Sequence, residues 1–332
     1  ITTENIKHAS GDYIIRENKK EWHAPDISAW KQKTFMGYHR TDGSVGTANY
    51  WLIVPLVFCE NRNVDVLKET MLEALGYARP KKYTHLMERL VHRYRSGQFH
   101  QKITETNFDT EVTEEEIPEK VFPFVDGIKF LSHDGGCGGT RQDAEALCGL
   151  LAGYITHANV AGATVLSLGC QHSQASILQR EIHKRSPKFD KPFFVLEQQQ
   201  IGLEKDLIAE AIRKTFAGLI IANECRRSPA PLTKLCIGLE CGGSDGFSGI
   251  SANPAIGHTS DLVVAAGGSV ILSEFPELCG VEQELNDRCT DIETAKRFAH
   301  LMTIYNKRAT EAGSGFDMNP SPGNIREGLI TD

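Results

Sequence analysis

The stretch YWLIVPLV at residues 50–57 decides the fold class of this chain. Its apolar residues run together without alternating with polar ones, which is typical of a strand buried on both faces of a parallel sheet. Further runs share this composition: GIKFL at 127–131, ATVLSL at 163–168, PFFVLE at 192–197, KLCIGLE at 234–240 and SVILSE at 269–274. Helical patterns separate them, near residues 64–77, 141–156, 174–184, 202–216 and 280–312. This alternation predicts an α/β protein with right-handed crossovers and doubly wound parallel sheets.

Two Rossmann-like doubly wound domains are the expected organisation, with the second one truncated. We place them at residues 34–225 and 226–332, because the segment NECRRSPAPLT between them is rich in Pro and polar residues. Residues 1–33 are expected to be the tail of an upstream small β module and a linker. The charged stretch at 78–120 is expected to be a surface insertion with one amphipathic helix, whose charges are solvated. Since the chain starts without Met, we expect a fragment of a longer protein.

Composition narrows the class of protein and of partner. The 332 residues suit about two domains, and 40% apolar with 24% charged residues is ordinary for a globular protein. The chain has a formal charge of -7, whereas proteins that bind nucleic acids or anionic membranes usually carry an excess of basic residues. No apolar run approaches the roughly 20 residues of a membrane span, and the first residues lack a signal-peptide core. We therefore expect a cytoplasmic protein that acts on a small molecule; a homo-oligomer stays open.

Cysteines follow three of the predicted strands. The nine cysteines are an odd number scattered along the chain, which argues against a disulfide framework. Cys137, Cys170 and Cys241 each stand beside Gly at a strand end, where a thiolate can point into a shared cleft and bind a borderline metal such as iron. The alternative is a buried thiol that acts as a small hydrophobe. We prefer that alternative for five cysteines on helical or strand patterns: Cys148, Cys225, Cys236, Cys279 and Cys289.

Polar side chains gather in the same loops. His133 precedes the Gly-Gly-Cys turn and is a candidate base or ligand, although a lone loop His is more often neither. The block LECGGSDGFSGISANP at 239–254 is denser in hydroxyl and amide groups than turn chemistry requires, and it runs into a helix start at Pro254. Such groups suit a polyhydroxy acid. The candidate substrate ligands are Arg40, Asn49, Ser244, Ser248, Asn253, Ser321 and Asn324.

Motifs for nucleotides are missing from the sequence. No GxGxxG follows a predicted strand and no GxxxxGK[ST] occurs, so the alternation of strands and helices alone does not indicate NAD or a nucleoside triphosphate.

With these loops identified, the sequence resembles the altronate dehydratase and galactarate dehydratase family of sugar-acid dehydratases. The resemblance rests on six segments: GYHRTDGSVGTANYWLIVPLVFC, SHDGGC, LSLGC, GLECGGSDGFSGISANPAIG, SEFPELCGVEQ and NPSPGN. It implies a lyase of bacterial hexuronate catabolism that uses iron or another divalent metal. The matching positions carry over His133, Cys137, Cys170, Cys241, Ser244, Asp245, Ser248 and Asn253. One departure is Ala48, where the family usually has Arg.

The expected reaction is loss of water from a 2,3-dihydroxy acid, most directly D-altronate to 2-keto-3-deoxy-D-gluconate. A base removes the proton beside the carboxylate, the 3-hydroxyl leaves, and a metal stabilises the enediolate. We assign His133 as base and Asp245 or Glu274 as proton carrier from their loop positions; a Lys beyond the end of the chain is an equal alternative. Iron(II) is the first expectation for the metal, with manganese and an iron–sulfur cluster left open. Galactarate dehydration, a sulfo-lyase reaction and noncatalytic sugar-acid binding are the alternative functions.

Overall fold

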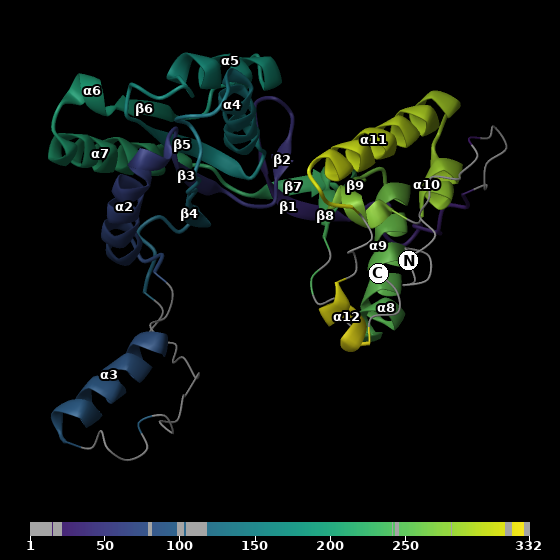
Figure 1. Cartoon of the computed structure of the whole chain (residues 1–332), viewed down its shortest axis with the longest axis horizontal. Coiled ribbons are helices and arrows are strands. Elements are labelled where there is room, and N and C mark those ends of the chain that lie inside the picture. The colour runs from purple at the N-terminus through teal and green to yellow at the C-terminus, as the bar shows by residue number, and fades with distance from the viewer. Residues whose placement is uncertain are drawn as a thin grey trace. The chain divides into compact units, whose positions relative to one another are not determined.

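A computed structural model describes most of the chain: residues 15, 22–78, 82–97, 103, 118–240, 242, 246–279, 281–315 and 321–328. The chain divides into two compact units, which are described separately (Figure 1). One unit comprises Met36–Pro229, and the other comprises Ile1–Phe35 together with Ala230–Asp332. The upstream β module predicted for residues 1–33 falls largely outside the described residues, and 22–33 contain only turns and irregular backbone.

A parallel four-stranded sheet forms the centre of the Met36–Pro229 unit, in the order β4-β3-β5-β6. Its strands are β3 (Tyr50–Pro55), β4 (Gly127–Phe130), β5 (Val160–Ser167) and β6 (Phe193–Glu197). These strands coincide with the first four apolar runs of the sequence, so the α/β class is confirmed. The central strand β3 is buried from Trp51 to Pro55, as an unbroken apolar run requires.

Helices cover both faces of this sheet (Figure 1). They are α2 (Asn61–Ala74), α4 (Arg141–Thr156), α5 (Ala175–Arg185), the short α6 (Gln198–Ile201) and α7 (Glu204–Ala222). Trp51 and Ile53 pack with α2 and α7, whereas Leu52 and Val54 pack with α4 and α5. The chain thus leaves β3 towards one face and leaves the neighbouring strand β5 towards the other. This divergence creates a topological switch point, where doubly wound proteins bind their ligands beyond the carboxyl ends of the strands.

Capping fixes the start of α4. The Thr140 side chain accepts a hydrogen bond from the Asp143 backbone N–H at 3.2 Å, and the Thr140 N–H donates to the Asp143 carboxylate at 2.7 Å. This reciprocal pair satisfies two N–H groups that have no partner inside the helix, and such a cap stabilises a helix by about 1 kcal/mol. The helix bounds Arg141–Thr156 agree with the predicted 141–156.

Several elements that lie wholly or partly in this unit are outside the main sheet. They are β1 (Thr34–His39), β2 (Val45–Gly46), the 3-10 helix η1 (Phe58–Glu60), α3 (Lys82–Arg95) and β7 (Ser228–Pro231). The three strands pair in the order β2-β1-β7, and their pairing was not predicted. Helix α3 lies within the predicted insertion at 78–120, much of which is outside the described residues.

The other unit is built around a parallel pair of strands, β8 (Cys236–Leu239) and β9 (Ser269–Leu272). Its helical elements are η4 (Leu232–Lys234), α8 (Gly246–Ile250), α9 (Ala252–Ala265), η5 (Phe275–Leu278), α10 (Glu282–Arg288), α11 (Ile292–Glu311) and α12 (Pro322–Arg326). Two strands do not make a doubly wound sheet, so the expected second Rossmann-like domain is not confirmed. In the described part of the chain no helix is both long and apolar enough to cross a membrane.

Two predicted helices of this unit differ from the structure. The single helix expected at 280–312 is two helices, because the Asp291 side chain accepts a hydrogen bond from the Thr294 N–H at 2.7 Å and begins α11 there. The helix expected to start at Pro254 starts at Ala252 instead. Pro254 is tolerated in the first turn, where its missing N–H has no intrahelical acceptor.

Candidate functional site

The loops after β4 and β5 are joined by backbone hydrogen bonds at the carboxyl edge of the four-stranded sheet. The Gly136 carbonyl accepts from the His172 N–H at 2.9 Å and from the Ser173 N–H at 3.3 Å. Gly136 has a φ of 99°, and a Cβ there would lie only 2.8 Å from Val57 Cα, with the Leu56 carbonyl oxygen closer still. Only glycine permits this approach, which explains why the turn carries it.

Buried polar side chains hold the loop after β5. The Gln171 amide donates to Ser167 Oγ at 2.6 Å, and its carbonyl oxygen accepts from the Gly169 N–H at 2.6 Å. The Ser173 hydroxyl donates to the Leu56 carbonyl. Ser167, Gln171 and Ser173 are almost completely buried, so these bonds are shielded from water and fix the loop.

This edge brings two of the predicted metal ligands onto joined loops. Cys137 and Cys170 are both exposed and follow β4 and β5. Cys148, by contrast, is buried in α4, and burial raises the pKa of its thiol to about 11. Cys137 and Cys170 therefore fit ligands better than core thiols, and Cys148 fits the core role predicted for it.

A third exposed thiol, Cys59, lies in η1 directly after β3 and was not among the predicted ligands. The sequence signal was present, because Cys59 follows its apolar run as closely as Cys170 follows its own. Among the described residues, no three His, Cys, Asp or Glu side chains lie close enough to hold a metal ion. Cys241 lies outside the described residues, so the three-thiol metal site stays a prediction.

One cysteine prediction is wrong. Cys236 was expected to be a buried thiol, but it is exposed in β8. The apolar run KLCIGLE does form the strand, yet alternate residues of β8 are exposed. A two-stranded sheet leaves one face of this strand open within the described part of the unit.

His133 ties the loop after β4 to the end of β3. Its Nε2 lies 2.8 Å from the Pro55 carbonyl, which can only accept, so Nε2 carries the proton. Its Nδ1 accepts a hydrogen bond from the Gly135 N–H at 3.2 Å. Both ring nitrogens of the neutral imidazole are therefore engaged, and action as a base requires Nδ1 to release the Gly135 N–H. The predicted catalytic role of His133 stays a prediction.

A buried carboxyl, Glu60, also lies at this edge and was not predicted. It is 1% exposed, and one oxygen accepts from the Asn63 amide at 2.7 Å. The other oxygen, Glu60 Oε1, is buried and has no hydrogen-bond partner. Burial raises the pKa of this carboxyl because it disfavours the charged form.

Arg40 and Asn49 lie at the opposite, amino edge of the same sheet. Asn49 is fully buried; its amide donates to the Phe124 carbonyl at 2.9 Å and to the Ala222 carbonyl at 3.0 Å. Its side-chain oxygen accepts from Arg40 at 2.9 Å, and Arg40 also donates to the Ala158 carbonyl at 2.8 Å. These bonds connect segments of the fold, so the structure does not bring the pair together with Cys137 and Cys170.

The second unit places one predicted residue, Glu274, just after the carboxyl end of β9. The Ser273 N–H donates to the Leu239 carbonyl at 2.8 Å, which joins the segment after β9 to the end of β8. Glu274 follows with a φ of 56°, and it is the only non-glycine residue of the described chain in the left-handed region. Such backbone strain is concentrated at functional sites, which favours Glu274 as a candidate.

The remaining candidates of this unit lie on short helices or outside the described residues. Ser248 is on α8, whose Gly246 lies against Gly328 beyond α12. Ser321 caps α12 by accepting from the Asn324 N–H at 3.3 Å, which accounts for its presence without a substrate. Asn253 lies in the first turn of α9. Cys241, Ser244 and Asp245 are outside the described residues.

The fold and these loops define a doubly wound α/β protein with a polar, thiol-bearing carboxyl edge. Residues 37–223 match the family model of the D-galactarate dehydratase/altronate hydrolase second domain, and residues 232–332 match that of the D-galactarate/altronate dehydratase C-terminal region. The chain therefore belongs to the D-galactarate/altronate dehydratase family.

Three curated relatives share this family. The altronate dehydratase of Bacillus subtilis (strain 168) is 30% identical over 91% of this chain and 50% of that protein. The altronate dehydratase of Escherichia coli (strain K12) is 33% identical over 62% of this chain and 41% of its own length. The galactarate dehydratase (L-threo-forming) of the same organism is 33% identical over 40% of this chain and 25% of its own length. The chain thus spans half the length of these relatives or less.

Proposed function

We propose that this chain is part of a hydro-lyase that converts D-altronate to 2-keto-3-deoxy-D-gluconate. The observation that carries the proposal is the pair of joined loops at the carboxyl edge, 133–137 and 168–174, which present Cys137 and Cys170 to solvent at the switch point of the sheet. The identity to altronate dehydratase over 91% of the chain supports the choice of substrate.

The reaction needs a proton acceptor beside the substrate carboxylate and a donor at the 3-hydroxyl. We assign the acceptor to His133 Nδ1, which becomes free when the Gly135 N–H turns away, and the donor to Glu274 or Asp245. Ser244, Ser248, Asn253, Ser321 and Asn324 bind the substrate hydroxyls in this proposal. Arg40 and Asn49 are left out of it, because their polar atoms bind carbonyls and each other at the amino edge.

A divalent metal belongs to the proposal, with iron(II) as the first candidate and manganese as the second. Cys137, Cys170 and Cys241 are its proposed ligands. When bound, such an ion polarises the substrate carboxylate and stabilises the developing enediolate. The fit of the described residues is incomplete, since they include two thiols on joined loops but no group of three His, Cys, Asp or Glu side chains close enough to hold an ion. No proton-transfer step is therefore assigned to the metal.

The test of activity is an anaerobic assay of the full-length protein supplied with ferrous iron. Formation of a 2-keto-3-deoxy acid from altronate is the expected result, with galactarate as the comparison substrate. Sulfite release from a sulfonated hydroxy acid would instead identify a sulfo-lyase. Failure to form product from any aldonate or aldarate would refute the dehydratase proposal.

The test of the ligands compares thiols that differ in position. Cys137→Ser and Cys170→Ser should lose bound iron and activity while the unfolding midpoint changes little, because both thiols are exposed. Cys236→Ser is the matched control, since that thiol is also exposed but distant in sequence from the joined loops. Cys148→Ser should keep its iron per folded molecule and lose about 1–3 kcal/mol, because it places a hydroxyl in an apolar cluster. Equal iron in all four variants would reject the ligand assignment.

Noncatalytic binding of a sugar acid is the second candidate, and the engagement of both His133 nitrogens favours it. Calorimetry with altronate distinguishes the two functions. Binding without turnover in the metal-loaded, full-length protein would support this second function over the first.

A further inference from the structure

The outward face of α4 carries no charge over most of its length. From Ala146 to Thr156 the helix contains no Asp, Glu, Lys or Arg. Its inner face packs Cys148, Leu151 and Ile155 on the sheet, as a surface helix does. Its outer face nevertheless exposes Leu150 and Tyr154, which are 60% and 48% exposed. A helix that is apolar on both sides is typical of one covered on both sides.

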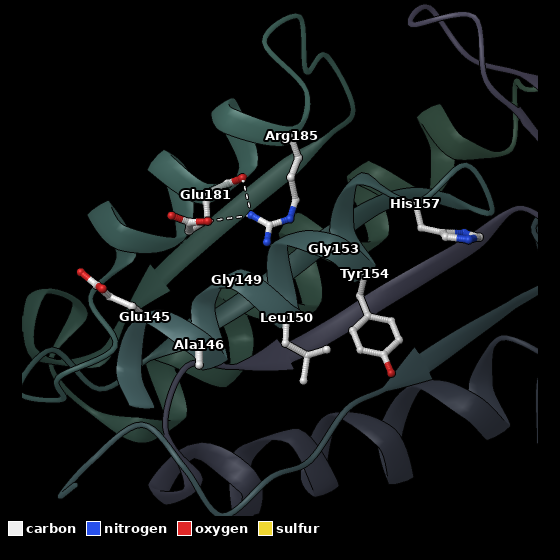
Figure 2. A pocket seen from close by; sticks show the side chains of 9 residues that line it. All are labelled: Glu145, Ala146, Gly149, Leu150, Gly153, Tyr154, His157, Glu181 and Arg185. Atoms are coloured by element: carbon white, nitrogen blue, oxygen red, sulfur yellow. Dashed lines mark hydrogen bonds and ion pairs between the residues drawn. The ribbon is translucent and has the colours of Figure 1, made fainter. Parts of the chain in front are cut away.

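A shallow groove of about 630 Å³ runs along this outer face (Figure 2). Gly149 and Gly153 form its floor. Nothing lies within 4 Å of a Cβ at Gly153, whereas a Cβ at Gly149 would lie 3.3 Å from the flexible Arg185 guanidinium, which has to turn aside before another backbone can approach there. Leu150 and Tyr154 stand along one side, and the Glu181–Arg185 ion pair of α5, with a nitrogen–oxygen distance of 2.7 Å, lies on the other. The groove therefore has the shape that a packed helix needs.

The polar ends of the groove indicate which helix fits it. Glu145 lies at the start of α4, and His157 follows its last residue. His157 Nδ1 accepts from the Asn159 N–H at 3.1 Å, so the neutral ring presents Nε2–H outward as a donor. A second α4 running antiparallel would place Glu145 of each copy opposite His157 of the other. The same two-fold axis places Gly149 of each copy opposite Gly153 of the other, so one arrangement satisfies both pairs.

We propose that two copies of this chain associate through their α4 helices, packed antiparallel across a two-fold axis. The glycines allow close contact at the axis, Leu150 and Tyr154 are buried beside it, and a carboxylate–imidazole hydrogen bond closes each end. Glu145, Gly149, Gly153 and His157 follow one another at four-residue spacing, so the two rows lie along each other when the helices cross at about −50°, the commonest packing angle. Antiparallel helix dipoles and the Glu145 carboxylate near a helix N-terminus add to this preference.

The first test is sedimentation equilibrium of the full-length protein over about two decades of concentration. A dimer is expected. Gly153→Gln should raise the dissociation constant of the dimer ~10-fold or more, which corresponds to about 1.4 kcal/mol. The substitution leaves the fold intact, because nothing lies within 4 Å of a Cβ at Gly153. Gly257→Gln is the matched control: Gly257 is an exposed glycine of α9 with equally open surroundings.

The second test exchanges charges across the axis. Glu145→Lys and His157→Glu should each weaken the dimer. The first variant places Lys opposite His157 at both ends, and the second places Glu opposite Glu145 at both ends. An equal mixture of the two variants should dimerise again, because it pairs Lys with Glu at one end and keeps the native pair at the other. Losing the exposed Glu145–Arg180 ion pair has little effect on folding.

Three outcomes would overturn the proposal. They are a monomer at every concentration, a dimer that Gly153→Gln leaves unchanged, and a mixture of charge variants that does not recover association. Circular dichroism melting of each variant confirms that it is folded.

Discussion

Gly218→Ala tests the packing of the central strand most directly. Gly218 lies in α7 against the fully buried ring of Trp51. A Cβ at position 218 would lie 2.7 Å from both Cζ2 and Cζ3 of that ring, and closer still to Cη2. Carbon atoms in contact are ordinarily 3.5–4.0 Å apart, so ring or helix has to move by about 1 Å or more.

The ring has little room to move. On the β5 side, a Cβ at Gly162 would lie 2.5 Å from Trp51 Cζ3, so Trp51 already fills the space between two glycines. Its indole N–H also donates to Thr164 Oγ1 at 3.2 Å. Overpacking of this kind costs about 1–3 kcal/mol, whereas Gly→Ala in a helix gains only about 0.5–1 kcal/mol. The clash therefore dominates, and a net loss of roughly 1–2 kcal/mol is expected.

The assay is urea unfolding followed by tryptophan fluorescence, which reports on Trp51 in this unit. Gly153→Ala is the control, because the same substitution in α4 meets nothing within 4 Å and should leave stability equal or slightly raised. The control is measured at the lowest practicable protein concentration, where association through α4 contributes least. Gly218→Ala with wild-type stability would refute the argument, and so would equal losses in both variants.

Three further outcomes follow from single residues. Gly136→Ala should lower the melting temperature and the activity together, since the new Cβ meets Val57 and the φ of 99° suits glycine alone; an unchanged melting curve would contradict this. Glu60→Gln should gain stability over the wild type as the pH rises above 4.5, because the raised pKa of the buried carboxyl means that its deprotonation opposes folding. Urea midpoints across pH measure this, and a stability gain that shrinks as the pH rises would contradict it. Glu274→Gly should lose activity but stabilise its unit by up to about 1 kcal/mol, because glycine relieves the left-handed backbone strain. Glu274→Ala keeps the strain and should lose activity without the gain in stability, a difference that thermal unfolding measures.

The main sheet could be predicted because its strands are buried on both faces and therefore have an unambiguous sequence pattern. Strands β1, β2 and β7 lack that pattern: β1 is exposed at half of its positions, β2 has two residues, and Pro229 and Pro231 lie in β7. The break between α10 and α11 was readable in principle from Asp291, which precedes Thr294 as a helix cap does. It was missed because apolar residues recur at helical spacing on both sides of the break.

The candidate site was predicted in part for the same reason. Parallel strands end at one edge, so Cys137 and Cys170 could be placed on neighbouring loops from the sequence alone. The same logic places Asn49 at the other edge, because it precedes its strand rather than following it. The exposure of a side chain was harder to predict. Whether the Cys236 thiol is exposed depends on what covers β8, which is a property of the tertiary structure rather than of the local sequence.

The hydrogen bond from the Asn49 amide to the Ala222 carbonyl can form only late in the synthesis of this unit. Its acceptor at Ala222 lies 173 residues further along the chain. At about 5–20 residues per second, a ribosome needs on the order of 10–30 s to reach that position. Until then α7 is incomplete and cannot cover Trp51, so the nascent unit exposes its most apolar strand. The yield of folded protein should therefore depend on translation speed between α2 and α7 and on chaperones that shield β3 during that interval.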